Sequence, residues 1–476
     1  REYVDTIYLY HYGLYDFLGA FFSKNFSSNY LIESHHILNL IFSIFSIFGI
    51  YQVTKKLFNI KIAKITFLIC FLNPLFFGHF SINPKDTIIA FSYIWIFYIS
   101  IKYVEKQNNL NSRINYLFYL ILLISLGLSI RLTFLFLLFP IFIVLLNEII
   151  TKKKEFNFFF KKFFFDLFLI LLSCFIITII FWPDTHTDLF SLPFLFIKNY
   201  FISFFSSNFG LPFGLLDGEL YQTQMTPKIY ILKFLLFKMP FYVILSLFLL
   251  PFFILSKNFS IKKFSSYKSF IYIFLQILFP IFLIILSGTA LNDGLRYILY
   301  VIPFVCLISS VSIFYIFYLN RFFTKLTKII FIFLFIYNFV IFLILTPYHY
   351  IFINNFNGKF SNNFNKFEND YWGTSLKELL IKANNNNIFD EKKNYKIATC
   401  GLHNSVIKFY LNRDFDIEYK FVNNNEKYDY IIFINRVYIP TENLNLMKLD
   451  TCYSKFNKKS IINVTRNGLP IAFISN

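Results

Sequence analysis

Residues 87–104 read TIIAFSYIWIFYISIKYV, an apolar run of eighteen residues whose single charge, Lys102, lies close to its end. A run of this length fits a helix that crosses the hydrocarbon core of a bilayer. An open strand cannot satisfy its backbone hydrogen bonds in lipid, so a spanning helix is the expected structure. The stretch therefore predicts a membrane protein.

Comparable apolar runs recur along the chain and predict a polytopic α-helical membrane protein with about ten or more spans. Lysine and arginine are frequent in every second connection, from Lys55 to Lys328, and scarce in the alternate connections. The positive-inside rule places the basic set in the cytoplasm. The other runs cover roughly 37–53, 62–78, 115–130, 132–150, 163–182, 229–256, 269–287, 298–320 and 328–346.

The composition agrees with this class. The 476 residues are 57% hydrophobic and 15% charged, and the mean hydropathy is +0.57, whereas an ordinary soluble domain is about 25% charged. A soluble globular enzyme and a disordered chain are thereby excluded. The net charge of +19 is typical of a basic cytoplasmic face in a chain this apolar, so no nucleic-acid partner is expected.

After residue 347 the composition becomes polar, and short strands and helices alternate. This pattern predicts a small extracytoplasmic α/β domain over 347–476, behind a polytopic domain over 1–346. The expected strands are 395–400, 428–434 and 469–474, and the expected helix is 402–411. Cys400 and Cys452 lie in this domain and can pair in an oxidising compartment, but the sequence leaves their pairing open.

Most carboxylates of the polytopic domain fall in the base-poor connections. Topology explains why bases are missing there but not why acids gather, since acids contribute little to orientation. We therefore expect an outward-facing polar site. The acids are Asp5, Asp16, Glu33, Asp86, Asp184, Asp188, Asp217, Glu219 and Asp293.

Residues 78–86 (GHFSINPKD) join two spans on this outer side. The Asn-Pro pair breaks the helix, and Asp86 then stands at the N-terminus of the next helix, where it can act as a cap. Lys85 beside that terminus gives a positive spot that suits a phosphate, with His79 close by. The alternative interpretation is a cap and a turn without further function.

Two arginines stand at other outer boundaries. Arg131 joins two apolar runs with almost no loop, so it must either snorkel to the interface or pair with an anion. Arg296 lies in the stretch Asn292–Tyr297 (NDGLRY), and its guanidinium can hold a phosphate through two hydrogen bonds. Asp293 can orient Arg296, or simply form a surface ion pair of little energetic value.

The first residues carry another polar group. The pattern from Ile7 to Phe22 predicts an amphipathic helix in the outer interface, with acids and a histidine at its polar edge. Interfacial aromatic residues with solvated acids explain the same pattern without a site. The residues concerned are Glu2, Asp5, His11, Tyr12 and Asp16.

Motifs for cofactors are weak. Asp184-Thr185-His186-Thr187-Asp188 offers oxygen and nitrogen ligands to a divalent metal, but ordinary loop turns use the same residues. The sequence contains no P-loop, HExxH or GxSxG, and no GxGxxG after a strand, so nucleotide chemistry in the cytoplasm is unsupported. A divalent metal is therefore the one cofactor that the sequence suggests, and the motif for it is weak.

In this order, the motifs resemble the C-type glycosyltransferases of bacterial membranes, a superfamily that includes protein O-mannosyltransferases and aminoarabinose transferases. The resemblance covers nearly the whole chain, and Asn-Pro-Lys-Asp and Asp-Gly-Leu-Arg-Tyr are its more specific parts. It implies an enzyme of the bacterial inner membrane with its site on the periplasmic side. Such an enzyme takes a hexosyl or pentosyl group from a polyprenyl-phosphate carrier and passes it to a lipid, glycan or protein.

The resemblance also assigns roles to residues. Asp5 matches the family's carboxylate base best, with Glu2 next, and Asp86 matches its second outer acid. Lys85, Arg131 and Arg296 match its phosphate clamps, and the remaining substrate-binding candidates are His11, Tyr12, His79 and Asp293. Family members carry a spanning helix before the first outer loop, so we expect a further segment ahead of Arg1.

Other function classes fit parts of the pattern. A transporter or flippase of an anionic lipid or polysaccharide precursor would place its charges near the membrane midplane and show related halves. The charges lie at the rim instead, and no internal repeat is seen. A polysaccharide polymerase or ligase would differ only in its acceptor, and a receptor on a passive anchor would not need about ten spans.

Overall fold

The computed structural model describes most of the chain and divides it into two compact units. The described residues are 13–27, 30–151, 156–182, 213–255, 267–318, 322–389, 394–415, 417–438, 450–456 and 460–476, with residues 186, 188, 191, 194 and 198. Unit 1 comprises Arg1–Asn208, Tyr242–Thr289 and Arg296–Phe333. Unit 2 comprises Phe209–Phe241, Ala290–Leu295 and Leu334–Asn476.

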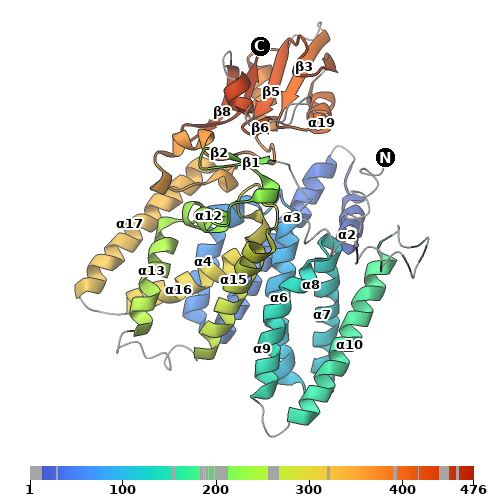
Figure 1. The fold of residues 1–476 in the computed structure, drawn as a ribbon, viewed down its shortest axis with the longest axis vertical. Coiled ribbons are helices and arrows are strands. Elements are labelled where there is room, and N and C mark those ends of the chain that lie inside the picture. Colours follow the sequence, from blue (N-terminus) through green and yellow to red (C-terminus); the bar gives the residue numbers. More distant parts are fainter. Residues whose placement is uncertain are drawn as a thin grey trace. The chain divides into compact units, whose positions relative to one another are not determined.

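Long apolar helices make up unit 1, and α6, α7, α9 and α10 lie side by side in it (Figure 1). A short helix, α2, precedes them, the 3-10 helix η5 leads into α16, and α17 begins in unit 1 and continues from Leu334 in unit 2. The bounds are α2 Leu14–Ser23, α3 Leu31–Leu57, α4 Ile60–Phe71, α5 Pro74–Gly78, α6 Asp86–Lys106, α7 Leu110–Ile130, α8 Phe134–Leu137, α9 Phe139–Ile150, α10 Phe156–Ile180, α13 Phe241–Leu255, α15 Tyr267–Ser287, η5 Arg296–Val301, α16 Ile302–Tyr318 and α17 Phe322–Leu345.

The predicted class of polytopic helical membrane protein is confirmed, and the residues that the structure describes contain fewer full-length spans than the predicted ten or so. Within the described residues, seven helices are long and apolar enough to cross a membrane, or eight if α12 (Tyr230–Lys238) and α13 form one broken span. Runs 62–78 and 132–150 account for most of the difference. Each is divided into shorter helices, α4 with α5 and α8 with α9.

Local chemistry explains these breaks. Asn73 accepts a hydrogen bond from the amide of Phe76, and Pro74 occupies the first turn, so the chain starts a new helix at α5. Arg131 has extended backbone angles (φ −153°, ψ 125°) and ends α7. Met239 is extended before Pro240, as expected for a residue that precedes proline.

The described part of one end of unit 1 holds several of the basic residues from the connections predicted to be cytoplasmic. At one end Lys56 pairs with Glu105, and Lys162 donates to the carbonyl of Gln107 over 2.9 Å. At the same end Arg113 donates from Nε to Asp166 over 2.7 Å and ties α7 to α10. The other end holds the start of α6 and the last turn of α7. Asp166 is a buried acid on the base-rich side that the loop pattern did not predict.

Burial separates inner from outer helices. In the spanning windows, 78% of residues are buried in α6 and 83% in the η5–α16 span, against 28% in α7 and 22% in α10. The exposed side chains of the outer helices include Phe165 and Phe168. Large exposed apolar faces of this kind are stable in a bilayer and not in water. Helices α6 and α16 therefore form the framework on which the charged rim is built.

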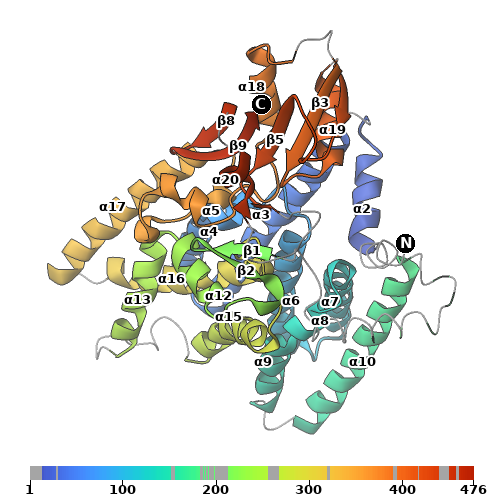
Figure 2. The same cartoon turned by 45° about the horizontal axis from the view of Figure 1, so that its top comes forward.

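Unit 2 contains a hairpin, several short helices and a mixed sheet. Its central sheet has the order β4-β3-β5-β9-β8, and Figure 2 shows β3, β5, β9 and β8 in sequence. Strand β3 pairs in parallel with β4 and β5, and β9 pairs antiparallel with β5 and β8. The bounds are β1 Phe213–Leu216, β2 Glu219–Gln222, α18 Leu376–Asn385, β3 Asn394–Cys400, α19 Asn404–Asp414, β4 Glu418–Phe421, β5 Tyr430–Ile434, β6 Val437–Tyr438, β7 Asp450–Thr451, α20 Cys452–Phe456, β8 Ser460–Arg466 and β9 Leu469–Ser475.

The predicted C-terminal elements agree with this sheet. Strands β3, β5 and β9 and helix α19 occupy the positions expected from the apolar runs, whereas β4 and β8 were not predicted. Strand β4 lies at one edge with Glu418 and Lys420 exposed, and its four residues are too short a stretch to be recognised from their alternation. The boundary at 346/347 remains a prediction.

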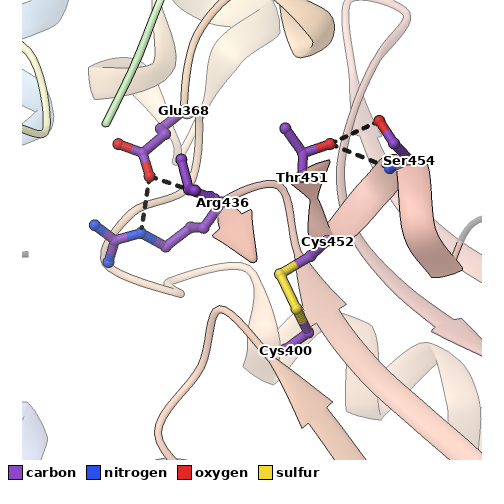
Figure 3. The surroundings of a disulfide bond; sticks show 7 residues. Glu368, Cys400, Arg436, Thr451, Cys452 and Ser454 are labelled. Atoms are coloured by element: carbon purple, nitrogen blue, oxygen red, sulfur yellow. Dashed lines mark hydrogen bonds and ion pairs between the residues drawn. A yellow bond between two sulfur atoms is a disulfide. The ribbon is translucent and has the colours of Figure 1, made fainter. Parts of the chain in front are cut away.

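A disulfide joins Cys400 at the end of β3 to Cys452 at the start of α20 (Figure 3). Cys400 and Cys452 therefore form a disulfide, which the sequence alone left open. Ala398, Phe433 and Phe473 pack in the same buried cluster as both cysteines. The bond therefore ties the segment after β7 to the centre of the sheet.

Candidate functional site

Asp86 is the centre of a polar cluster in unit 1. It is the first residue of α6 and only 3% exposed. The side-chain amide of Asn83 donates to its Oδ2 over 2.8 Å, while Asn83 Oδ1 accepts the backbone amide of Asp86 over 3.1 Å. Asn83 thus performs the capping that the sequence assigned to Asp86. The Asp86 carboxylate is left to bind other groups.

Arg131 is the main partner of that carboxylate. It lies directly after α7, and its Nη2 donates to Asp86 Oδ1 over 2.6 Å. The side chain of Arg131 is 27% exposed, against 4% for that of Asp86. A buried carboxylate therefore anchors one side of the guanidinium, and the other side remains at the surface. Of the two alternatives for Arg131, pairing with an anion is the one observed.

Lys85 carries a second positive charge to the same place. Burial by the surrounding protein lowers its pKa, and the neighbouring charge of Arg131 lowers it further. Arg296 acts in the same direction, whereas Asp86 and Asp16 oppose the shift. Repulsion between cations shows that the positive groups lie within electrostatic reach of one another. Their mutual repulsion would be relieved by a bound anion.

Arg296 completes the group of cations from the start of η5. Its guanidinium lies over the ring of Tyr297 at 4.8 Å from the ring centroid, and its Nη2 donates to the Tyr297 hydroxyl over 3.0 Å. The guanidinium of Arg131 lies 5.3 Å from the centroid of the same ring. Tyr297 thus contacts both arginines through cation–π interactions, and it was missed as a site residue because aromatic residues are so common in this chain.

Helix α2 brings a second carboxylate, Asp16, towards Lys85. The Asp16 side chain remains exposed, but the surrounding protein displaces enough of its water to raise its pKa to about 6, and Lys85 opposes the increase. The helix is held close to α7, since Ser129 Oγ accepts the amide of Tyr15 over 3.3 Å. A Cβ atom on Gly13 would lie 2.5 Å from that of Ser129, so only glycine allows this approach. The sequence placed Asp16 merely at the polar edge of a helix.

Buried hydrogen bonds fix the turn below the charges. His79 is fully buried, and its Nδ1 lies 3.2 Å from the side-chain amide of Asn83. Thr87 donates to Asn39 Oδ1 over 2.6 Å and so links α6 to α3. His79 is therefore placed under the turn and helps to orient Asn83.

The remaining predicted residues have different positions. Glu2, Asp5, His11 and Tyr12 lie outside the described residues. Asp293 belongs to unit 2, where its Oδ1 accepts from Arg436 Nη2 over 2.6 Å. The pair is buried, in contrast to the surface ion pair considered above.

Metal ligation finds little support in the part of the chain that the structure describes. Asp184 lies outside it, and Asp188 accepts the amide of Ser191 over 3.0 Å in a local turn. The described residues contain no group of three or more His, Cys, Asp or Glu side chains arranged to hold a metal ion.

The cluster has a clear chemical capacity. Lys85, Arg131 and Arg296 bring three positive charges, and Asp86 and Asp16 bring two carboxylates, one buried in an ion pair and one with a pKa near neutrality. Preorganised cations of this kind stabilise the charge of a phosphate leaving group, and a carboxylate of raised pKa can exchange a proton. The site rests on the ends of α6, α7 and η5 and on α2.

Comparisons with known proteins agree with this geometry. Residues 15–182 match the sequence profile of the family described as dolichyl-phosphate-mannose-protein mannosyltransferase. The fold is similar to that of ArnT from Cupriavidus metallidurans bound to undecaprenyl phosphate, with a TM-score of 0.50 and 10% identity over 98% of this chain and 88% of that chain. The apo state of that protein gives a TM-score of 0.49 with the same identity and coverage.

No curated protein matches the sequence. The family profile covers Asp16, Lys85, Asp86 and Arg131 of the cluster. These findings agree with the resemblance inferred from the sequence: the chain is a polytopic membrane protein with a fold similar to that of ArnT, and its residues 15–182 match the profile of the mannosyltransferase family.

Proposed function

We propose that this protein is an integral-membrane glycosyltransferase that moves a hexosyl or pentosyl group from a polyprenyl-phosphate donor to an extracytoplasmic acceptor. The observation that carries the proposal is the group of three cations, Lys85, Arg131 and Arg296, at one end of a membrane helix bundle. A lipid-linked donor delivers its phosphate at this depth. ArnT, whose fold is similar, was crystallised with undecaprenyl phosphate, which agrees with such a donor.

In the proposed reaction the three cations bind the donor phosphate. The bond between the sugar C1 and the phosphate oxygen breaks, and a bond from the acceptor oxygen to C1 forms. The polyprenyl phosphate leaves with the electron pair, and the acceptor hydroxyl gives its proton to a carboxylate. The donor carries its own leaving group, so the reaction requires no nucleotide.

The identity of the base follows in part from the family resemblance. Asp5 is the first candidate and Glu2 the second, with His11 and Tyr12 beside them as substrate-binding residues. Asp16 is a third candidate, because its pKa of about 6 suits proton transfer near neutral pH. Asp86 is buried in its ion pair, so its proposed role is to hold Arg131 in place.

The proposed location is the bacterial inner membrane, with the site and the C-terminal domain on the periplasmic side. The base-rich end of unit 1, which includes Lys56 and Arg113, then faces the cytoplasm. The disulfide between Cys400 and Cys452 supports an oxidising surrounding for the C-terminal domain.

A transfer assay in proteoliposomes tests the proposal. Purified protein is supplied with radiolabelled polyprenyl-phosphate hexose or pentose and a membrane extract as the source of acceptor. Sugar transfer that requires Lys85 and Asp86 supports the enzyme, and wild-type transfer by both Lys85→Gln and Asp86→Asn refutes the assigned site. Movement of the lipid across the bilayer without product would instead identify a transporter.

A further inference from the structure

Residues 290–295 form a loop of unit 2 whose backbone is hydrogen-bonded to other parts of that unit. Thr226 Oγ1 accepts the amide of Leu291 over 3.0 Å, and the Tyr221 hydroxyl donates to the carbonyl of Leu291 over 2.7 Å. The Tyr230 hydroxyl accepts the amide of Gly294 over 2.9 Å. The loop is therefore fixed at both its beginning and its end.

The loop turns at Asp293 and Gly294, which both have left-handed backbone angles (φ 57° and 71°). Asparagine, aspartate and glycine adopt this region most readily, but for aspartate it is still uncommon. The ion pair with Arg436 holds Asp293 there: the Nη2–Oδ1 distance is 2.6 Å, and the side chains are 14% and 5% exposed. A buried pair of this geometry is a fixed point of the structure.

Arg436 is itself held from several sides. Its Nη1 donates to the carbonyl of Tyr371 over 3.1 Å, and its Nε lies 3.5 Å from Glu368 Oε1 (Figure 3). Burial raises the pKa of Glu368, and Arg436 opposes the increase. Asp293 lies nearer to the guanidinium than Glu368 does, so it is the closer counter-charge of Arg436.

The disulfide region fixes the backbone of Arg436. The amide of Cys452 donates to the Arg436 carbonyl over 2.8 Å. A Cβ atom on Gly401, the neighbour of Cys400, would lie 3.2 Å from the Cβ atom of Arg436. The arginine is thus packed between the two segments that the disulfide joins.

The turn ends two residues before Arg296. Leu295 is 1% exposed and is joined to Arg296 by a peptide bond. We propose that Arg436 is a positioning residue for sugar transfer, because it fixes the Asp293–Gly294 turn that carries Arg296 to the donor phosphate. This inference rests on the proposed function for its catalytic consequence, but not for the anchoring itself.

The anchoring is tested by hydrogen–deuterium exchange of the full-length protein in detergent. Arg436→Gln and Asp293→Asn are expected to speed exchange in a peptide covering 290–300 by about tenfold or more. Arg466→Gln is the matched control, because it removes another arginine–carboxylate pair of unit 2, with Glu378 at 2.5 Å. Unchanged exchange in 290–300 for Arg436→Gln, or an equal increase for Arg466→Gln, would overturn the inference.

The consequence for the site is tested by binding of undecaprenyl phosphate. Arg436→Gln is expected to weaken binding by about tenfold, Arg436→Lys by less, and Arg466→Gln not at all. The double variant Arg436→Gln/Arg296→Gln should bind no more weakly than Arg296→Gln alone, since Arg436 acts through Arg296. Losses that multiply in the double variant would overturn the inference.

The two proposals fail in different ways. If the wild-type protein neither binds undecaprenyl phosphate nor transfers sugar, the proposed function is refuted, and the exchange experiment still decides whether Arg436 anchors the turn. If the wild type binds and transfers but the exchange pattern contradicts the prediction, only the positioning role is refuted.

Discussion

Arg131 donates a hydrogen bond from Nη2 to Oδ1 of Asp86 over 2.6 Å, although the two residues are 45 positions apart. The bond joins the end of α7 to the start of α6. It places a guanidinium at the rim of the bundle beside Lys85, and it leaves a surface-facing part of Arg131 for a ligand.

The first prediction concerns this pair. Arg131→Gln leaves the Asp86 carboxylate buried without its counter-charge, so the free energy of unfolding should fall by about 3 kcal/mol. Asp86→Asn should cost less, because the partly exposed Arg131 can still donate to the remaining oxygen, although the new amide nitrogen then faces the donating amide of Asn83. Chemical unfolding in detergent measures both, and the double variant should be less destabilised than the sum of the single variants. Strict additivity would show that the two residues do not interact.

The second prediction concerns Asp16. If its carboxylate takes the acceptor proton, the rate of transfer should rise with pH around a midpoint of about 6, and Asp16→Asn should abolish that rise. Because the pKa of Asp16 is higher in the folded protein, its contribution to the free energy of unfolding is complete below its unfolded pKa. This contribution is lost as the pH rises through about 6. Asp16→Asn should therefore lose activity at pH 7 without losing stability. A variant that retains the wild-type pH profile would exclude Asp16 as the base.

The third prediction concerns the contact between α2 and α7. Gly13→Ala adds a methyl group 2.5 Å from the Cβ atom of Ser129, so α2 must move away and transfer should fall. Overpacking of this kind costs about 1–3 kcal/mol. Ser129→Gly removes the nearest atom but leaves its Cα and carbonyl oxygen 3.0 Å from the new methyl group, and it removes the acceptor of the Tyr15 amide, so the double variant Gly13→Ala/Ser129→Gly should recover only part of the activity. Absence of recovery would show that Gly13 acts in another way.

The fourth prediction concerns the side of the membrane that unit 2 faces. Of the five cysteines, Cys70, Cys174 and Cys306 are free and buried, and the other two form the disulfide. Protein taken from cells and unfolded without reductant should therefore bind three maleimide groups, and five after reduction. Five labelled thiols without reductant would place the C-terminal domain in a reducing compartment.

Much of the fold could be predicted from the sequence, because apolar length and alternating charge act locally. Run 87–104 became α6, and the strands expected at 395–400 and 469–474 became β3 and β9. Helix breaks were harder to predict, because the end of α7 at Arg131 is accompanied by an ion pair with Asp86, a partner distant in the sequence. That partner depends on how the helices pack.

The site could be predicted only in part for the same reason. Lys85, Asp86 and Arg131 were singled out by their unusual positions, but their mutual pairing is a product of the fold. Asn83 was expected to break a helix and proved also to cap the next one. Arg436 carries no local signal at all, since it follows β5 as one of many basic residues and reaches Asp293 across 143 positions.

Binding of undecaprenyl phosphate tests the central claim most directly, because the cations are proposed to hold a lipid-linked phosphate. Wild-type protein in detergent should bind it, and Lys85→Gln or Arg296→Gln should weaken binding by about 10- to 100-fold, the value of a charge-assisted hydrogen bond. Lys102→Gln, which removes a charge near Glu105 at the base-rich end, should bind like the wild type. Equal affinity in all four proteins, or no binding by the wild type, would contradict the account.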